Sequence, residues 1–202
     1  MRLTRFTTSL AFILSALIAL ATLRVFPLGL DMAFPSMPHQ IKNMPTGFLL
    51  HIGAASFALL FGGYQILPGM RKRHLKLHRW IGRLYALTVL IGGASGLFIA
   101  FNIDGAVGVI GFALLAVLWL FTTAKAILYA RAKNIAVHRI WMIRSFALTF
   151  AAVTLRLQLA LFMFGLHMPY EQVYPILAWS CWVPNILFAQ WWVSKYPRPV
   201  KA

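Results

Sequence analysis

The chain has 202 residues, of which 61% are hydrophobic and 11% charged, and its mean hydropathy is +0.78. A soluble globular domain is about 45–50% apolar, so this composition excludes an ordinary soluble protein and indicates that lipid is the main solvent. The net charge of +16 would suit nucleic acid in a soluble chain, but here the cations are confined to short segments between apolar runs, which excludes a nucleic-acid-binding domain.

Six apolar segments approach the length of about 20 residues that an α-helix needs to cross the hydrocarbon core of a bilayer. In chain order they lie near residues 7–26, 47–68, 80–101, 106–130, 140–165 and 174–194. The sequence therefore predicts an all-α, multi-span transmembrane bundle of about six helices. We expect four divisions: an N-terminal anchor helix at 1–26, an outer loop at 27–46, a four-helix core at 47–165, and a C-terminal helix and tail at 166–202.

The first segment has two interpretations. A basic start, an apolar run and the sequence Ala19-Leu20-Ala21 together resemble a cleavable signal peptide. The apolar run continues as far as Phe26, interrupted only by Arg24, which favours a retained anchor helix. Cleavage would leave five spans and an N-terminus on the outer side.

Acidic and basic residues fall on alternate connections between the segments. The three acids, Asp31, Asp104 and Glu171, stand on one set of connections, and the basic runs at 69–79 and 131–139 stand on the other. Lys and Arg beside transmembrane helices are retained on the cytoplasmic side. We therefore predict a protein of the bacterial inner membrane with both termini in the cytoplasm. Its cations would meet anionic lipid headgroups, at about 1 kcal/mol for each residue near the surface.

The last segment contains Pro184 and the only cysteine, Cys181. A proline inside a helix removes one backbone hydrogen bond, so we expect a bend there, tolerated in lipid where neighbouring groups satisfy the freed carbonyl. A single cysteine excludes an intrachain disulfide and every cysteine-rich metal or iron–sulfur arrangement.

Two stretches in the middle of the chain are similar to each other. His78-Arg79 leads to Tyr85-Ala86-Leu87-Thr88, and His138-Arg139 leads to Phe146-Ala147-Leu148-Thr149. Each follows a basic connection, so the second with the third segment and the fourth with the fifth would form two hairpins of the same orientation. The alternative is chance similarity between apolar stretches.

These stretches resemble the domain-of-unknown-function 2306 family of bacterial membrane proteins. The matching pieces, within residues 47–165, are His51, GGYQILPGMRKR from Gly62, HRWIGRLY from His78 and HRIWMIRSFALTFAAVTLRL from His138. The family implies no particular reaction, but its layout is similar to helical b-type cytochromes such as the cytochrome b561 group. Those two-haem proteins usually carry two histidines on each of two helices, whereas the third and fifth segments here carry one each.

His78 and His138 open helices that run in the same direction, so we expect them at the same depth. In an up-and-down bundle the third and fifth segments are diagonal neighbours whose side chains meet across the centre. The two imidazoles are therefore candidate axial ligands of one iron, that of haem b, with Arg79 and Arg139 as partners of its propionates. The alternatives are that each His-Arg pair only anchors a helix end at the interface, or that the histidines bind another metal or a quinone.

Arg156 lies five helical turns beyond His138, on nearly the same face as Ser145 and Thr149. An arginine at the bilayer centre costs about 2.5–3.5 kcal/mol on insertion scales, so it needs a partner. The candidates are Glu171 or Asp104 at the rim, helix carbonyls, or an anionic or carbonyl-bearing ligand such as a quinone. We therefore count Arg156 among the candidate cofactor-binding residues.

No phosphate-binding loop, HExxH, GxSxG or pair of carboxylates is present, which excludes the common soluble-enzyme chemistries. The leading hypothesis is a b-type haem or quinone-linked electron-transfer subunit. One alternative is a non-enzymatic small-solute transporter whose polar path uses Arg156, Thr149, Ser145 and His51. Another is a structural or assembly protein that contacts its partners through GxxxG faces. Enzymatic activity and oligomeric state stay open at this point.

Overall fold

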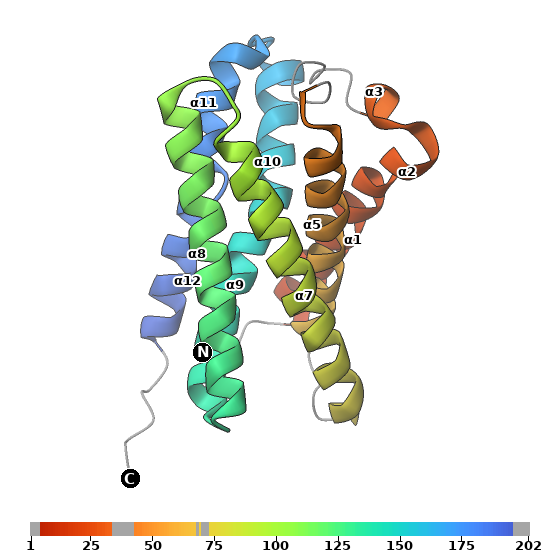
Figure 1. Cartoon of the computed structure of the whole chain (residues 1–202). Helices are drawn as coiled ribbons and strands as arrows, with labels where there is room; N and C mark the ends of the chain where they lie inside the picture. Colours follow the sequence, from red (N-terminus) through yellow and green to blue (C-terminus); the bar gives the residue numbers. More distant parts are fainter. Residues whose placement is uncertain (1–4, 34–42, 68, 70–72, 196–202) are drawn as a thin grey trace.

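A computed structural model describes residues 5–33, 43–67, 69 and 73–195 of the chain. Within these ranges every regular element is helical (Figure 1), which confirms the predicted fold class. Five helical stretches are long and apolar enough to cross a membrane: Phe6–Leu28, Pro45–Gln65, Leu75–Ala100, Ala106–Arg131 and Ile135–Gly165. They correspond to the first five predicted segments.

Four helices form the predicted core. They are α5 (Pro45–Gln65), α7 (Leu75–Ala100), α8 (Ala106–Arg131) and α9 (Ile135–Thr149). Each packs against its neighbours in chain order, and α9 closes the ring by packing against α5. This leaves α7 and α9 diagonal, and their side chains do meet across the centre: Tyr85 Oη lies 2.6 Å from Ser145 Oγ.

The N-terminal helix α1 (Arg5–Leu23) packs along α5, at a point where Gly63 lets the two backbones come close. A Cβ atom on Gly63 would lie 3.1 Å from Cβ of Ser15, so a larger residue would push the helices apart. Two short helices follow: α2 (Val25–Leu28), which begins inside the predicted anchor helix, and α3 (Leu30–Ala33), which lies within the predicted outer loop. Arg24 donates to the carbonyl of Ala33 at 2.9 Å. Residues 34–42 of that loop lie outside the described part of the chain.

The fifth predicted segment is interrupted where one continuous helix was expected. After α9 ends at Thr149, the chain continues as α10 (Ala151–Ala160) and one π-helical stretch, η1 (Leu161–Gly165). The Thr149 hydroxyl donates to the carbonyl of Ser145 at 3.0 Å, and such bonding back to the preceding turn often bends a helix. The interruption turns α10 toward α1 and α11, against which it packs.

The sixth predicted segment consists of two helices, α11 (Tyr170–Ser180) and α12 (Val183–Ser194), so the expectation of one bent helix is wrong in detail. Its physical basis holds, because Pro184 has no N–H to offer to the carbonyl of Ser180. The side chain of Gln158 donates to that carbonyl instead, at 3.3 Å. Thr154 donates to the next carbonyl, that of Cys181. Side chains of α10 thus donate hydrogen bonds to the main-chain carbonyls at the break between α11 and α12.

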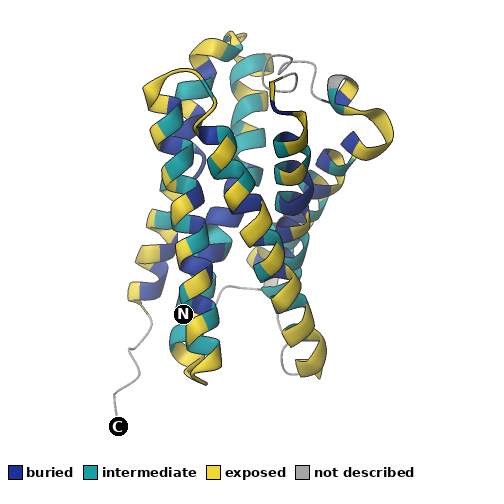
Figure 2. Ribbon diagram, viewed as in Figure 1, coloured by how far each residue is buried: buried dark blue, intermediate teal, exposed yellow. Residues whose placement is uncertain are grey.

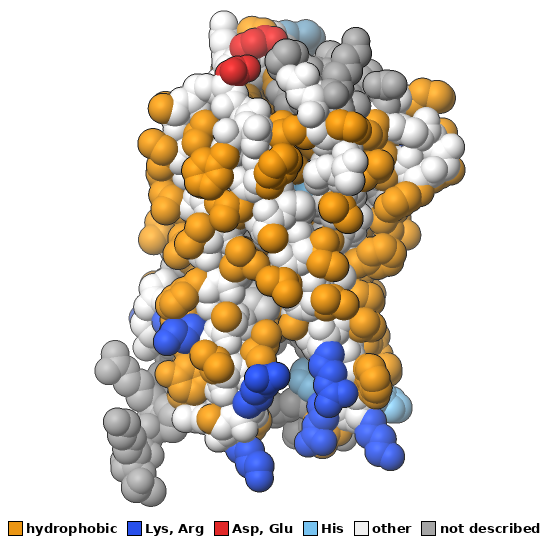
Figure 3. Space-filling view, in the orientation of Figure 1, with side chains coloured by type: hydrophobic (Ala, Val, Ile, Leu, Met, Phe, Trp, Pro, Cys, Tyr) orange, Lys and Arg blue, Asp and Glu red, His pale blue; other side chains and the backbone are white. Residues whose placement is uncertain are grey.

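Charge is separated along the bundle (Figure 3), with acidic side chains at one end and Lys and Arg gathered at the other. We call the end with Asp104 and Glu171 the acidic end, and the end with residues 73–79 and 131–139 the basic end. Figure 3 shows hydrophobic side chains over the surface between the two ends, and Figure 2 shows many exposed residues there; Leu87 in the middle of α7, for example, is 53% exposed. A monomeric soluble protein rarely exposes so extensive an apolar surface, so this belt indicates contact with lipid.

Candidate functional site

A cavity of about 250 Å³ lies in the half of the bundle nearer the acidic end. Helices α1, α5, α7, α8, α9, α10 and α11 all contribute to its wall, which is mostly apolar. A cavity of about 150 Å³ in another protein accepts benzene, so this one has room for a substituted ring. Few polar side chains line it, and they are therefore the groups that would orient a ligand.

Arg156, on α10, is the charged group of this cavity. Its Nη1 donates to the carbonyl of Ala152 at 3.2 Å, and among the described residues its guanidinium forms no ion pair. Of the partners predicted for Arg156, a helix carbonyl is the one that it contacts. The carboxylates of Asp104 and Glu171 are exposed at the acidic end instead. A guanidinium has five N–H donors, so most of its donors remain for a ligand.

His51, on α5, lines the same cavity and is held in one orientation. Its Nδ1 lies 2.8 Å from the carbonyl oxygen of Gly92 on α7. A carbonyl can only accept, so Nδ1 carries the hydrogen, and in the neutral ring Nε2 is left as an acceptor. Gly96 makes room for the ring, because a Cβ there would lie 2.9 Å from Nδ1. The two glycines therefore position an imidazole as well as packing α7 against α5.

Tyr170 and Tyr174 bring aromatic rings from α11 to the cavity wall. Their ring centroids are 5.4 Å apart. The hydroxyl of Tyr170 is buried and has no hydrogen-bond partner among the described residues. Burial, with smaller contributions from Tyr174 and Glu171, raises the pKa of Tyr170, so its phenol stays protonated and able to donate.

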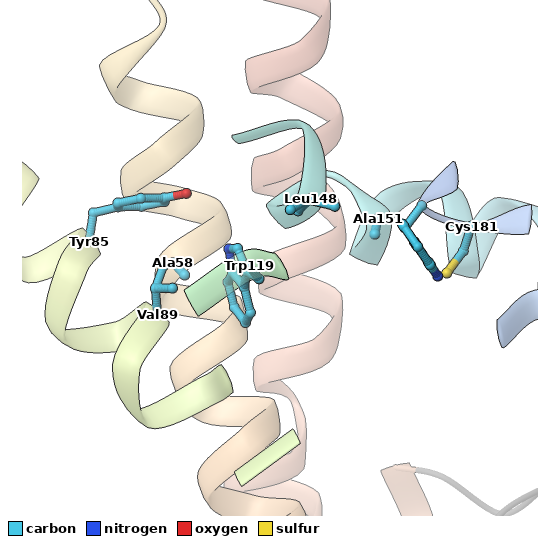
Figure 4. Packing of buried hydrophobic residues seen from close by; sticks show 8 residues of the cluster. Ala58, Tyr85, Val89, Trp119, Leu148, Ala151 and Cys181 are labelled. Atoms are coloured by element: carbon cyan, nitrogen blue, oxygen red, sulfur yellow. The ribbon is translucent and has the colours of Figure 1, made fainter. Parts of the chain in front are cut away.

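A hydroxyl cluster closes the cavity on the side toward the basic end. It is organised by Tyr85, whose Oη lies 2.6 Å from Ser145 Oγ and 2.7 Å from Thr149 Oγ1. Trp119 Nε1 donates to Thr149 at 2.9 Å, and Thr123 Oγ1 lies 2.6 Å from Ser145 Oγ. All five side chains are buried, and Figure 4 shows Tyr85 of α7 and Trp119 of α8 between the helices. Because Thr149 and Trp119 also line the cavity, the cluster forms its floor.

The predicted haem ligands lie nearer the basic end, outside the cavity. His138 Nδ1 is 2.8 Å from the carbonyl oxygen of Ala126, so Nε2 is the ring nitrogen that is not engaged in this contact. The main-chain carbonyl of His78 accepts from Gln65 at 2.7 Å. Among the described residues, no group of three or more His, Cys, Asp or Glu side chains is arranged to hold a metal ion. A site at His78 and His138 would thus depend on these two ligands.

The register of α7 and α9 bears on whether these two histidines face each other. His78 and His138 each stand seven residues, nearly two turns, before Tyr85 and Ser145, the pair that meets across the bundle. Each histidine therefore lies on about the same helix face as the residue that makes this contact. The side chains of Arg79 and Arg139, the predicted propionate partners, are exposed. The ligand roles of all four residues stay predictions.

Residues 48–193 match a family model described as a predicted membrane protein, DUF2306. The chain belongs to the DUF2306 family. This confirms the resemblance seen in the sequence and extends it through α11 and α12. No curated protein and no solved structure matches the chain, so the similarity in layout to the cytochrome b561 group stays a prediction.

The region that matches the DUF2306 family contains Arg156, His51, Tyr170 and the whole hydroxyl cluster. Sequence reasoning singled out Arg156, His51, Ser145 and Thr149 but missed Tyr170, Trp119 and Thr123. Trp119 and Thr123 are four residues apart, a spacing that places two side chains on one helix face. That spacing could have predicted that Trp119 and Thr123 act together on one face of α8. Nothing in the spacing of Tyr170 points to the cavity.

Proposed function

We propose that this protein is a membrane-embedded electron-transfer subunit that binds a quinone in the cavity lined by Arg156 and His51. The observation that carries the proposal is a guanidinium facing an apolar cavity without an acidic partner among the described residues. A buried cation is costly unless it is paired. A quinone would place its ring against the apolar wall and offer a carbonyl oxygen to Arg156.

We extend the proposal to a second site nearer the basic end. There the imidazoles of His78 and His138 would hold haem b, and Arg79 and Arg139 would pair with its propionates. The register of α7 and α9 supports this assignment. So does the contact between His138 Nδ1 and the carbonyl of Ala126, because histidines that bind metals usually donate their other ring N–H to such a group. When bound, the haem supplies one-electron redox chemistry; the chain supplies its ligands and charge partners.

We further propose that the basic end faces the cytoplasm of a bacterium, binds anionic lipid headgroups and lies at the inner interface of the membrane. Cations at this end are combined with aromatic rings, as the interfacial belts of membrane proteins are. The guanidinium of Arg83 lies 5.2 Å from the ring centre of Trp80, and the ammonium of Lys195 lies 5.7 Å from that of Trp191. Both chain termini would then be cytoplasmic.

Replacing Arg156 with glutamine is expected to weaken quinone binding by about 10- to 100-fold, because a hydrogen bond to a charged group contributes about 1.5–3 kcal/mol. The measurement is calorimetric titration of trimethyl-1,4-benzoquinone into the protein in lipid nanodiscs, with protein-free nanodiscs as the blank. Arg144→Gln is the matched control, since Arg144 bonds to Gln190 on α12 and does not line the cavity. Equal affinity in Arg156→Gln and the unsubstituted protein would contradict the proposal.

Replacing His138 with alanine is expected to abolish the Soret absorption of protein purified from cells supplied with haem, because one axial ligand would be lost. His74→Ala is the control, since His74 is exposed at the start of α7 and should leave the spectrum unchanged. Unsubstituted protein that stays colourless after haem reconstitution would overturn the haem site. A colourless protein whose solute uptake depends on Arg156 would instead support the transporter alternative.

A further inference from the structure

We infer that His51 makes the cavity selective for the reduced form of its ligand, a hydroquinone, over the quinone. This inference rests on the proposed function and concerns the same cavity. It starts from the difference between the two forms: a quinone offers only acceptor oxygens, whereas a hydroquinone also carries O–H donors. Nε2 of His51, the ring nitrogen that does not bond to Gly92, can discriminate between the two forms because it can accept a hydrogen bond from an O–H group.

The contacts of His51 leave it little freedom to present a donor to the cavity. Its Nδ1 is engaged with the Gly92 carbonyl at 2.8 Å, and the ring lies against Gly96, where only a residue without Cβ fits. Nε2 is thus the polar atom available to a ligand. With Nδ1–H donating to the Gly92 carbonyl, the neutral ring carries its lone pair on Nε2. His51 therefore presents a lone pair.

The other polar groups of the cavity are donors or weaker acceptors than an imidazole nitrogen. Arg156 can only donate, and the hydroxyl oxygens of Tyr170 and Ser56 accept a hydrogen bond less strongly than that nitrogen does. The hydroxyl of Thr22 donates to Ile18 of its own helix at 2.7 Å, and that of Thr149 belongs to the hydroxyl cluster. A quinone would satisfy Arg156 and leave Nε2 of His51 without a donor. A hydroquinone could satisfy both, with one oxygen accepting from Arg156 and one O–H donating to His51.

The test is the ratio of two dissociation constants, measured in nanodiscs without oxygen for trimethylhydroquinone and for trimethyl-1,4-benzoquinone. We expect the unsubstituted protein to bind the hydroquinone about tenfold more tightly, the effect of one buried acceptor left unmet by the quinone. His51→Phe removes the acceptor and should bring the ratio to about one. His51→Gln, whose amide oxygen can accept, should retain part of the preference. Thr88→Val, on α7 outside the cavity wall, should leave the ratio unchanged.

The outcomes separate this inference from the proposed function. Saturable binding of both forms with equal affinity by the unsubstituted protein would overturn the inference and leave the quinone site intact. A preference that persists in folded His51→Phe would also overturn it. Absence of saturable binding for both forms would overturn the proposed function itself. If His51→Phe fails to fold, as judged by circular dichroism, the unsubstituted protein decides: a hydroquinone that binds no more tightly than the quinone overturns the inference.

Discussion

Replacing Tyr85 with alanine is expected to lower the free energy of unfolding by about 3–5 kcal/mol, the usual range for truncating a buried aromatic residue to alanine. Tyr85 is 1% exposed and packs in the central core with Val89 and Trp119. Its removal would leave an enclosed space that lipid tails cannot reach. It would also take a hydrogen-bond partner from Ser145 and Thr149. The effect can be measured by SDS titration in mixed micelles, followed by circular dichroism.

Tyr85→Phe is the matched control, since it keeps the ring and removes only the hydroxyl. Hydrogen bonds between transmembrane helices average about 0.6 kcal/mol, so we expect a loss of about 1 kcal/mol for the two bonds together. Equal losses in the two variants would show that the hydroxyl, and not the packing of the ring, joins α7 to α9. A loss below about 1 kcal/mol in Tyr85→Ala would contradict the central position of this residue.

Replacing Gly111 with alanine is expected to destabilise the protein by about 1–3 kcal/mol, as overpacking of a close contact does. A Cβ on Gly111 would lie 2.6 Å from the carbonyl oxygen of Ala178 and 2.9 Å from its Cβ. The first of these atoms is backbone, so α11 itself would have to move away from α8. Because α11 also carries Tyr170 and Tyr174, the same variant should weaken ligand binding.

Gly82→Ala is the control for this substitution, because it makes the same chemical change where space exists. The nearest atom to its Cβ would be Nε2 of Gln65 at 3.6 Å, an ordinary contact. Alanine favours a helix over glycine by up to about 1 kcal/mol, so this variant should be as stable as the unsubstituted protein or more so. SDS titration of the two variants side by side gives the comparison. Equal stability of Gly111→Ala and Gly82→Ala would contradict close packing of α8 on α11.

The helices themselves could be predicted almost completely, because each apolar segment must satisfy its backbone hydrogen bonds within itself once it is in lipid. The same reasoning explains the break before Pro184, where a missing N–H is visible in the sequence. Which groups compensate was not predictable. Gln158 and Thr154, on α10, reach the freed carbonyls only because α10 packs beside α11.

The candidate site could be predicted only in part. Arg156 stands out in the sequence, since a lone cation inside an apolar segment is costly wherever it points. His51 was visible as a polar residue in an apolar segment, but its fixed orientation depends on the carbonyl of Gly92, some forty residues later. Tyr170 follows a turn outside the apolar segments, and no periodicity connects it with Arg156. The cavity joins these residues, and it forms only when the helices pack.

The sequence by itself determined that this is an all-helical membrane protein, where its long helices lie, how its charges alternate between the two ends, and which family it resembles. These properties depend on local hydrophobicity and on the chemistry of single residues, and both can be read directly from the sequence. Only the tertiary structure decided that α7 and α9 meet through Tyr85 and Ser145, and that Arg156, His51 and Tyr170 line one cavity. These are contacts between distant parts of the chain, set by how closely the side chains of neighbouring helices pack.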